Sequence, residues 1–176
     1  MAEKKLYDNL FKVIKANSGE VNANDTVLTE ILDLQIPRGY AARIRKVIFR
    51  DNINADQNEQ AHFFLRGALV LDPDDEDTTA IPTFTVDHDV ACDFEHEYME
   101  LVEDTTPNGI SFLHNKETEH IFNEDLDVVT VRNVRFNIIT NGLDVAGELG
   151  SQVKVLVYFT YEKIAMDLYA KLLGIS

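Results

Sequence analysis

Apolar and polar residues alternate with a period of two over most of the chain, which is typical of β-strands that bury one face. The clearest case is residues 152–164, in which every odd-numbered position from Val153 to Tyr161 is apolar or aromatic. The same alternation predicts further strands at 26–36, 40–50, 60–72, 81–86, 90–102, 110–114, 118–123 and 127–140.

Two of these strands contain a slip in the alternation. In 40–50, the apolar positions resume one step out of phase at Val47. An extra residue in one strand of an antiparallel pair produces such a slip, so we expect a β-bulge at Arg45 and Lys46. The segment 127–140 also changes phase, and we expect it to form one long strand.

The two ends of the chain follow a helical pattern instead. Between residues 3 and 16, apolar residues recur at spacings of three and four, which predicts a short amphipathic helix. The tail after residue 164 is again helical in pattern. It places Asp167 and Lys171 four residues apart, where they can pair on one face of a helix.

This order of elements predicts an all-β fold. Strands and helices do not alternate along the chain, and no internal repeat is visible, so an antiparallel sandwich or barrel is expected. The count is eight or nine strands, and eight strands of this length suit a single eight-stranded jelly-roll sandwich with short N-terminal and C-terminal helices. We therefore divide the chain into a helical arm and connector (1–25), a jelly-roll β-sandwich (26–164) and a helical tail (165–176).

The chain is strongly acidic, and its cations are concentrated in one place. The formal net charge is -15, yet five of the 16 basic residues lie between residues 36 and 51. Such cations could pair with acids of the same chain across the sheet, or they could meet acids of a neighbouring subunit. The general surface is unsuited to nucleic acid, because phosphate contacts need clustered cations. The basic cluster consists of Arg38, Arg43, Arg45, Lys46 and Arg50.

Residues that could carry catalysis form no complete motif. The chain has no glycine-rich phosphate loop, no G-x-S-x-G elbow and no H-E-x-x-H pair. The single cysteine, Cys92, lies in a predicted strand near several acids, so we expect a buried thiol rather than a reactive one. We predict no catalytic residue, no metal site and no cofactor.

Two groups of residues are the strongest candidates for a metal site. The acidic segment 72–77 offers oxygen ligands that suit Ca²⁺, but it lacks the glycine and distal glutamate of an EF-hand loop. Cupin metalloenzymes use inward histidines of a jelly roll in an H-x-H pair, whereas His88 and His96 are eight residues apart. We therefore expect no metal between them. The residues that could join these histidines are Asp87, Asp89, Glu100, His114 and His120.

The order of elements resembles that of a known family of viral proteins. A helical N-terminal arm precedes the strands, the stretch "IPRGYAARIRKVIFR" forms one of the first, and the final strand "QVKVLVYFTYEKI" is followed by a short tail. This arrangement resembles the single jelly-roll capsid proteins of icosahedral double-stranded DNA viruses of archaea and bacteria. In that family, the subunits stand upright on an internal membrane.

The resemblance implies a structural capsid subunit that is made in the host cytoplasm and resides in the virion. Its expected partners are copies of itself and other capsid proteins, with no small-molecule substrate. The expected subunit interface joins the basic residues Arg38, Arg43, Arg45 and Arg50 to the acidic residues Asp72, Asp74, Asp75 and Asp77 of a neighbour. The N-terminal arm could contact an internal membrane or the genome through Lys4, Lys5, Lys12 and Lys15.

Three other functions are compatible with the same pattern. The chain could be a minor virion spike or decoration protein of the same fold. It could be a cellular β-sandwich that binds carbohydrate, although the absence of tryptophan weakens this alternative. It could also be a cupin-like metalloenzyme. No targeting peptide and no apolar run of about 18 residues is visible, so we expect a soluble product.

Overall fold

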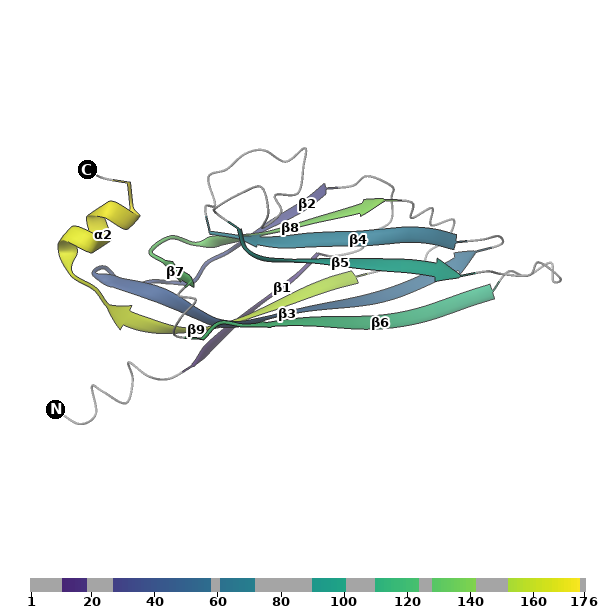
Figure 1. Cartoon of the computed structure of the whole chain (residues 1–176), viewed down its shortest axis with the longest axis horizontal. Coiled ribbons are helices and arrows are strands. Elements are labelled where there is room, and N and C mark those ends of the chain that lie inside the picture. Colours follow the sequence, from purple (N-terminus) through teal and green to yellow (C-terminus); the bar gives the residue numbers. More distant parts are fainter. Residues whose placement is uncertain are drawn as a thin grey trace.

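The computed structural model describes residues 11–18, 27–57, 61–71, 90–100, 110–123, 128–141 and 152–174. Nine strands and one helix lie within these ranges. In chain order they are β1 (Lys12–Asn17), β2 (Val27–Leu32), β3 (Tyr40–Gln57), β4 (Ala61–Val70), β5 (Val90–Glu100), β6 (Ile110–Ile121), β7 (Val128–Thr130), β8 (Val134–Asn141), β9 (Gln152–Lys163) and α2 (Met166–Leu172), as shown in Figure 1.

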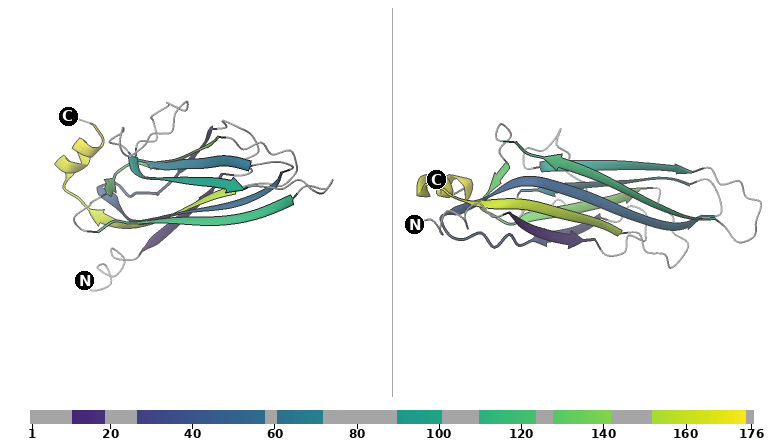
Figure 2. Two further views of the ribbon diagram at one scale, coloured as in Figure 1. Left: turned by 45° about the vertical axis from the view of Figure 1, so that its right-hand side comes forward. Right: turned by 90° about the horizontal axis from the view of Figure 1, so that it is seen from below.

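The strands form two antiparallel sheets that lie face to face. One sheet has the order β1-β9-β3-β6, with β7 paired to one end of β3, and the other has the order β2-β8-β4-β5. Figure 2 shows the two layers from further directions. The all-β prediction is therefore confirmed at the level of a two-sheet β-sandwich, as the period-two pattern required.

The hydrophobic core fills the space between the sheets. From β9, alternate residues between Val153 and Phe159 point inward and are buried. They face the buried side chains of β8 in the other sheet, including Phe136. Phe49 of β3 bridges the layers, because its ring centroid lies 5.8 Å from that of Phe136 and 4.7 Å from that of Phe94. Full burial of one large apolar side chain stabilises the folded state by roughly 1.5–3 kcal/mol.

The two slips in the alternation have different structural causes. The register between β3 and β9 shifts between Ile44 and Lys46, which confirms the predicted bulge. The prediction of one long strand over 127–140 is wrong. There the chain pairs with β3 as β7, bends at Val131 and Arg132, and enters the opposite sheet as β8. Val128 of β7 packs against the same core as Val134 and Phe136 of β8, so the inward positions are even-numbered in both strands.

The predicted N-terminal helix is wrong over the part that the structure describes. Residues 12–17 form β1, which pairs along its whole length with β9. Ile14 packs against the core and Ala16 is buried within it, so sheet pairing outweighs the helical spacing. The sandwich therefore begins at Lys12 instead of residue 26, whereas residues 3–10 lie outside the described ranges.

Three other expectations have mixed outcomes. The C-terminal helix is confirmed as α2. The strands expected at 110–114 and 118–123 are instead one strand, β6, which continues through the intervening polar residues. Its pairing with β3 explains this continuity, because β3 is long enough to hydrogen-bond along all of β6. The strand expected at 81–86 lies outside the described residues.

Candidate functional site

A buried polar network connects the two sheets where the edge strands β5 and β6 meet. Asp51 of β3 lies at its centre, with a side chain that is 0% exposed. Its Oδ2 accepts hydrogen bonds from Nδ1 of His96 at 2.7 Å and from the hydroxyl of Tyr98. Its Oδ1 accepts one from the backbone N–H of Lys116 at 2.7 Å. The second ring nitrogen of His96, Nε2, lies 2.6 Å from Oγ1 of Thr118.

Strand pairing and alternation place these four side chains and the backbone N–H of Lys116. Asp51 lies opposite Lys116 in the register between β3 and β6, and Thr118 follows two positions later on the same face. On β5, His96 and Tyr98 belong to the inward row that also holds Cys92 and Phe94. The alternation along 90–102 predicts that these four residues share one side, and the structure confirms it. The sequence pattern offered no signal that they would meet Asp51.

The network keeps a carboxylate in the interior by surrounding it with donors. Three hydrogen bonds satisfy the carboxyl oxygens of Asp51, which would be costly to bury without partners. Burial raises the pKa of Tyr98, and its hydrogen bond to Asp51 and the charge of that carboxylate act in the same direction. The ammonium group of Lys116 lies 4.0 Å from the centre of the Tyr98 ring, which adds a cation–π contact.

Asp51, His96 and Thr118 have the acid–histidine–hydroxyl order of a nucleophilic relay. However, the side chains of Asp51 and His96 are buried between the packed sheets. A second hydrogen bond also joins β6 to β5, because Nε2 of His120 lies 2.8 Å from the backbone oxygen of Asp93. We interpret both contacts as hydrogen bonds that hold the edges of the two sheets together.

The candidate metal ligands are not brought together in the described part of the chain. Both ring nitrogens of His96 are engaged in the network, and His120 contacts a backbone oxygen. No group of three or more potential ligands occurs among the described residues. The acidic segment 72–77 and Asp87, His88 and Asp89 lie outside those ranges.

Cys92 is buried within the hydrophobic core. Burial raises the pKa of its thiol, and the neighbouring charge of Asp93 raises it further. Because the thiolate is the reactive form, the thiol is protected in the folded state. The expectation of a structural cysteine therefore agrees with its surroundings.

Most of the basic cluster is paired with acids of the same chain. Arg43 and Arg45 both reach Glu162 of β9, at 2.6 Å and 3.4 Å. On the other side of β3, Lys46 lies 2.8 Å from Glu119 and Arg50 lies 2.5 Å from Glu117, both on β6. The intrachain alternative thus accounts for these cations in the subunit. Contact between the cluster and a neighbour's residues 72–77 stays a prediction.

The remaining predicted residues have separate locations. Arg38 is exposed in the turn before β3, next to Gly39 at φ 80°. Lys12 and Lys15 lie on β1, where both are exposed, and the ammonium of Lys12 lies 4.3 Å from the Tyr161 ring centre. Lys4 and Lys5 lie outside the described residues. The two described lysines therefore belong to an edge strand instead of a helical arm.

Neutralising Glu162 is expected to weaken the fold, because two arginines share this carboxylate. We expect Glu162→Gln to lower the free energy of unfolding by about 1 kcal/mol, since the group is one-third exposed and solvent screens the pairs. Urea denaturation measures the change. The matched control is Glu117→Gln in the more exposed Arg50–Glu117 pair, where we expect at most about 0.5 kcal/mol. Equal losses would contradict a special role for the shared carboxylate.

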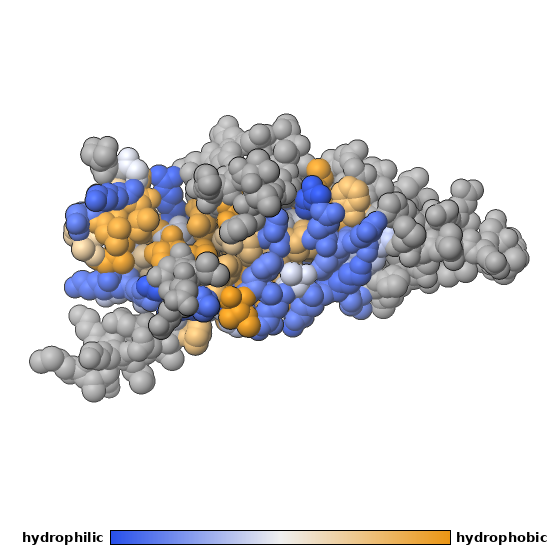
Figure 3. Space-filling model, in the orientation of Figure 1, coloured by the Kyte–Doolittle hydropathy of each residue, from blue (hydrophilic) through white to orange (hydrophobic). Residues whose placement is uncertain are grey.

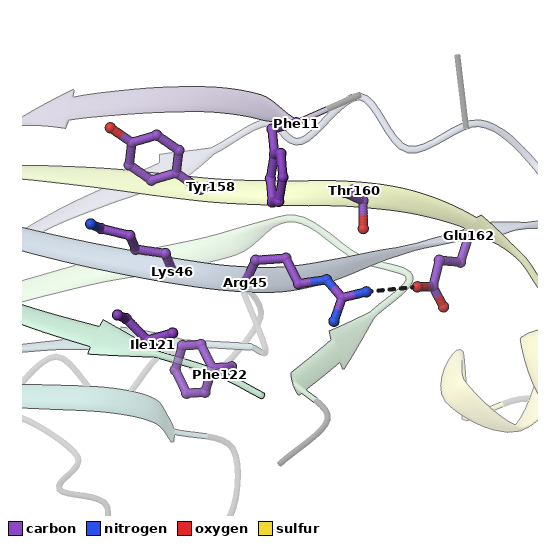
Figure 4. Close-up of a pocket in the computed structure, with 8 residues that line it drawn as sticks. All are labelled: Phe11, Arg45, Lys46, Ile121, Phe122, Tyr158, Thr160 and Glu162. Carbon is purple, nitrogen blue, oxygen red and sulfur yellow. Dashed lines mark hydrogen bonds and ion pairs between the residues drawn. The ribbon is translucent and has the colours of Figure 1, made fainter. Parts of the chain in front are cut away.

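An open groove runs across the outer face of the β1-β9-β3-β6 sheet, with a volume of about 560 Å³. Figure 4 shows Phe11 and Tyr158 on one side of Arg45 and Lys46, with Ile121 and Phe122 on the other. We call it the outer groove. Its lining residues are Phe11, Arg45, Lys46, Ile121, Phe122, Tyr158, Thr160 and Glu162.

The sequence interpretation missed the outer groove, although a signal was present. Ile121 and Phe122 are adjacent apolar residues, so one of them must leave the buried face of a strand. Phe11 and Val13 likewise alternate with Ile14 and Ala16, which makes both faces of β1 apolar. Such two-faced apolar strands indicate that a second surface of the sheet is available for contacts.

Comparison with known proteins adds no relative to these observations. No protein-family model matches the chain, and no curated protein matches its sequence. Within the described ranges, no helix has the length and apolar character needed to cross a membrane. Function is therefore inferred from strand order, surface and charge.

Proposed function

We propose that this chain is a structural viral capsid subunit that assembles with further copies of itself into an icosahedral shell. A second capsid protein could take part in the shell. The proposal includes the finer description of the sandwich as an eight-stranded jelly roll with one additional short strand, β7.

The observation that carries the proposal is the nested pairing of the strands. The outermost pair is β1 with β9, followed inward by β2 with β8, β3 with β6, and β4 with β5. Nested antiparallel pairs are what one long ribbon of eight strands makes when it folds back on itself. Pairing of β9 with β3 and of β8 with β4 then closes the ribbon into two sheets. This order supports a jelly roll, a fold common in viral capsids.

The surface of the sandwich also favours assembly. Large apolar side chains are exposed both around the outer groove and on α2. Monomeric soluble proteins rarely expose large contiguous apolar patches, and such patches commonly mark interaction sites. A net charge of -15 keeps separate subunits soluble until specific contacts form. Raised salt should then weaken the association of subunits, because it screens exposed pairs of basic and acidic residues.

Self-assembly is tested with the full chain. We expect size-exclusion chromatography with light scattering to show species well above the monomer mass of 20.0 kDa as protein concentration rises. Negative-stain microscopy should then show closed shells. A chain that stays at 20.0 kDa over a wide range of concentration and salt would contradict the proposal. Small closed oligomers that never form shells would favour a spike or decoration protein.

A further inference from the structure

Exposed apolar side chains are concentrated at two places in the described part of the chain. Around the outer groove, Phe11 is 65% exposed and Ile121 is 69% exposed. On α2, Leu168 is 46% exposed, and Met166 and Leu172 are exposed as well. Among the described residues, two further large apolar side chains, Val13 and Ile31, are exposed outside α2 and the lining of the outer groove.

The helix α2 projects from one end of the sandwich and none of its residues is buried. Figure 1 places it beyond the ends of β3 and β9, and Figure 3 shows hydrophobic surface at this end of the molecule. Leu168 and Leu172 are separated by one helical turn and therefore share a face. Asp167 and Lys171 form an adjacent row on the same exposed side. The helix thus presents an apolar row next to an acid and a base.

Two intrachain hydrogen bonds hold α2 away from the outer groove of its own chain. The backbone N–H of Ile164 donates to the carbonyl of Gly39 at 3.2 Å and directs the chain out of β9. Nη2 of Arg132 donates to the carbonyl of Leu173 at 2.8 Å and anchors the far end of the helix. Both ends of α2 are therefore attached to its own chain, while none of its residues is buried.

The outer groove offers a complementary surface. Its two apolar sides enclose a charged row in which Lys46, Arg45 and Glu162 follow one another (Figure 4). The Thr160 hydroxyl in its lining is buried and has no hydrogen-bond partner among the described residues. A volume of about 560 Å³ lies in the range of sites that enclose a drug-sized ligand, so a few side chains of one helical turn would fit.

We propose that α2 of one copy of this chain lies in the outer groove of a neighbouring copy. Leu168 and Leu172 pack between the aromatic and aliphatic sides of the groove. Asp167 faces Arg45 and Lys46, and Lys171 faces Glu162, so that the charges of helix and groove match in order. This contact rests on the proposed self-assembly and specifies which surfaces meet.

The contact joins two different surfaces, so each subunit can donate a helix to one neighbour and receive a helix from another. Repetition of such a contact closes into a ring or continues into a larger assembly, depending on the rotation between subunits. A shell needs contacts of this kind in addition to any two-fold contact. A contact of this kind is therefore compatible with assembly of a shell, and it leaves the fold of the sandwich unchanged.

Cross-linking between single-cysteine variants tests the contact. We expect a mixture of Leu168→Cys and Ile121→Cys chains, one carrying a mass tag, to form mixed dimers with a short bis-maleimide. The matched control replaces Ile121→Cys with Ile31→Cys, which is exposed on β2 of the opposite sheet. Native Cys92 is buried and contributes little background. Mixed dimers should exceed the control several-fold, and a yield equal to the control would overturn the proposal.

Two further variants separate this inference from the proposed function. A chain with both Leu168→Cys and Ile121→Cys should not cross-link within one molecule, and an intrachain product would show that α2 covers its own groove. Replacing Leu168 and Leu172 by Asp should weaken association at least tenfold without unfolding the chain, since neither side chain is buried. Normal assembly of this variant would overturn the α2 contact and leave self-assembly intact. Failure of the wild-type chain to assemble would overturn both.

Discussion

Replacing Asp51 by Ala is expected to lower the free energy of unfolding by about 3–5 kcal/mol. The carboxylate is fully buried and accepts hydrogen bonds from His96, Tyr98 and the backbone N–H of Lys116. Its removal leaves three donors without an acceptor between two packed sheets. Each buried group that loses its partner costs about 1–3 kcal/mol, although the losses are not additive.

Two measurements check this prediction. Urea denaturation gives the loss of stability, and the rate at which a thiol reagent labels Cys92 reports opening of β5, the strand that also carries His96 and Tyr98. Asp33→Ala is the control, because Asp33 is exposed and accepts one local hydrogen bond from the N–H of Gln35. A loss for Asp51→Ala no larger than that of the control would show that the network does not tie the sheets together.

Replacing Gly67 by Ala is expected to destabilise the sandwich by about 1–3 kcal/mol, because it overfills a packed site. A Cβ at this position would lie 2.4 Å from Cε1 of Phe94 and 3.1 Å from the backbone oxygen of Asn137. Phe94 is buried and its ring centroid lies 4.7 Å from that of Phe49, so it cannot move without disturbing the core. The same urea denaturation measures the loss.

A compensating change provides the control for Gly67. Phe94→Leu removes the ring atoms that a Cβ would meet, at the cost of core packing. We expect Gly67→Ala to cost clearly less in the Phe94→Leu background than in the wild-type chain, since the two residues are in contact. Equal costs in both backgrounds would place the strain at the backbone of Asn137 instead.

The role of Gly67 in the structure differs from the role that its position in the sequence indicates. Within an apolar strand, a glycine marks either a kink or a close approach of another group. From the sequence, the glycine within the strand predicted at 60–72 indicates a possible kink at Gly67. The structure instead shows β4 paired without interruption at this point, with Phe94 opposite on β5 and Ile138 opposite on β8. The glycine makes room for an aromatic ring that lies 27 positions away in the sequence.

The helix predicted for the N-terminal segment is wrong for a related reason. The spacing of Leu10, Val13 and Ile14 fits a helix, and nothing within the segment contradicts that pattern. However, β9 offers β1 a full set of hydrogen-bonding partners, and the core offers a place for Ile14. Local spacing is a weak determinant when a neighbouring strand is available to pair.

The pattern of apolar positions by itself determined the class of fold and much of its detail. It located the long strands, the inward row of β5, the bulge before Val47 and the helical tail, because each depends on residues that are close in the sequence. Burial of one face imposes a period of two on a strand, and an inserted residue shifts it, wherever the partner strand lies. These features can therefore be predicted from the chain alone.

Tertiary structure alone decided which strands became neighbours and which polar groups met. Asp51 and His96 are 45 residues apart, and Arg43 and Glu162 lie on strands separated by most of the chain. Their contacts depend on the register of β3 against β6 and β9 and on the folding of one sheet over the other. The outer groove arises in the same way, because four separate segments bring Phe11, Lys46, Ile121 and Tyr158 together. Contacts between distant segments are set by the global packing of the core, which no local pattern records.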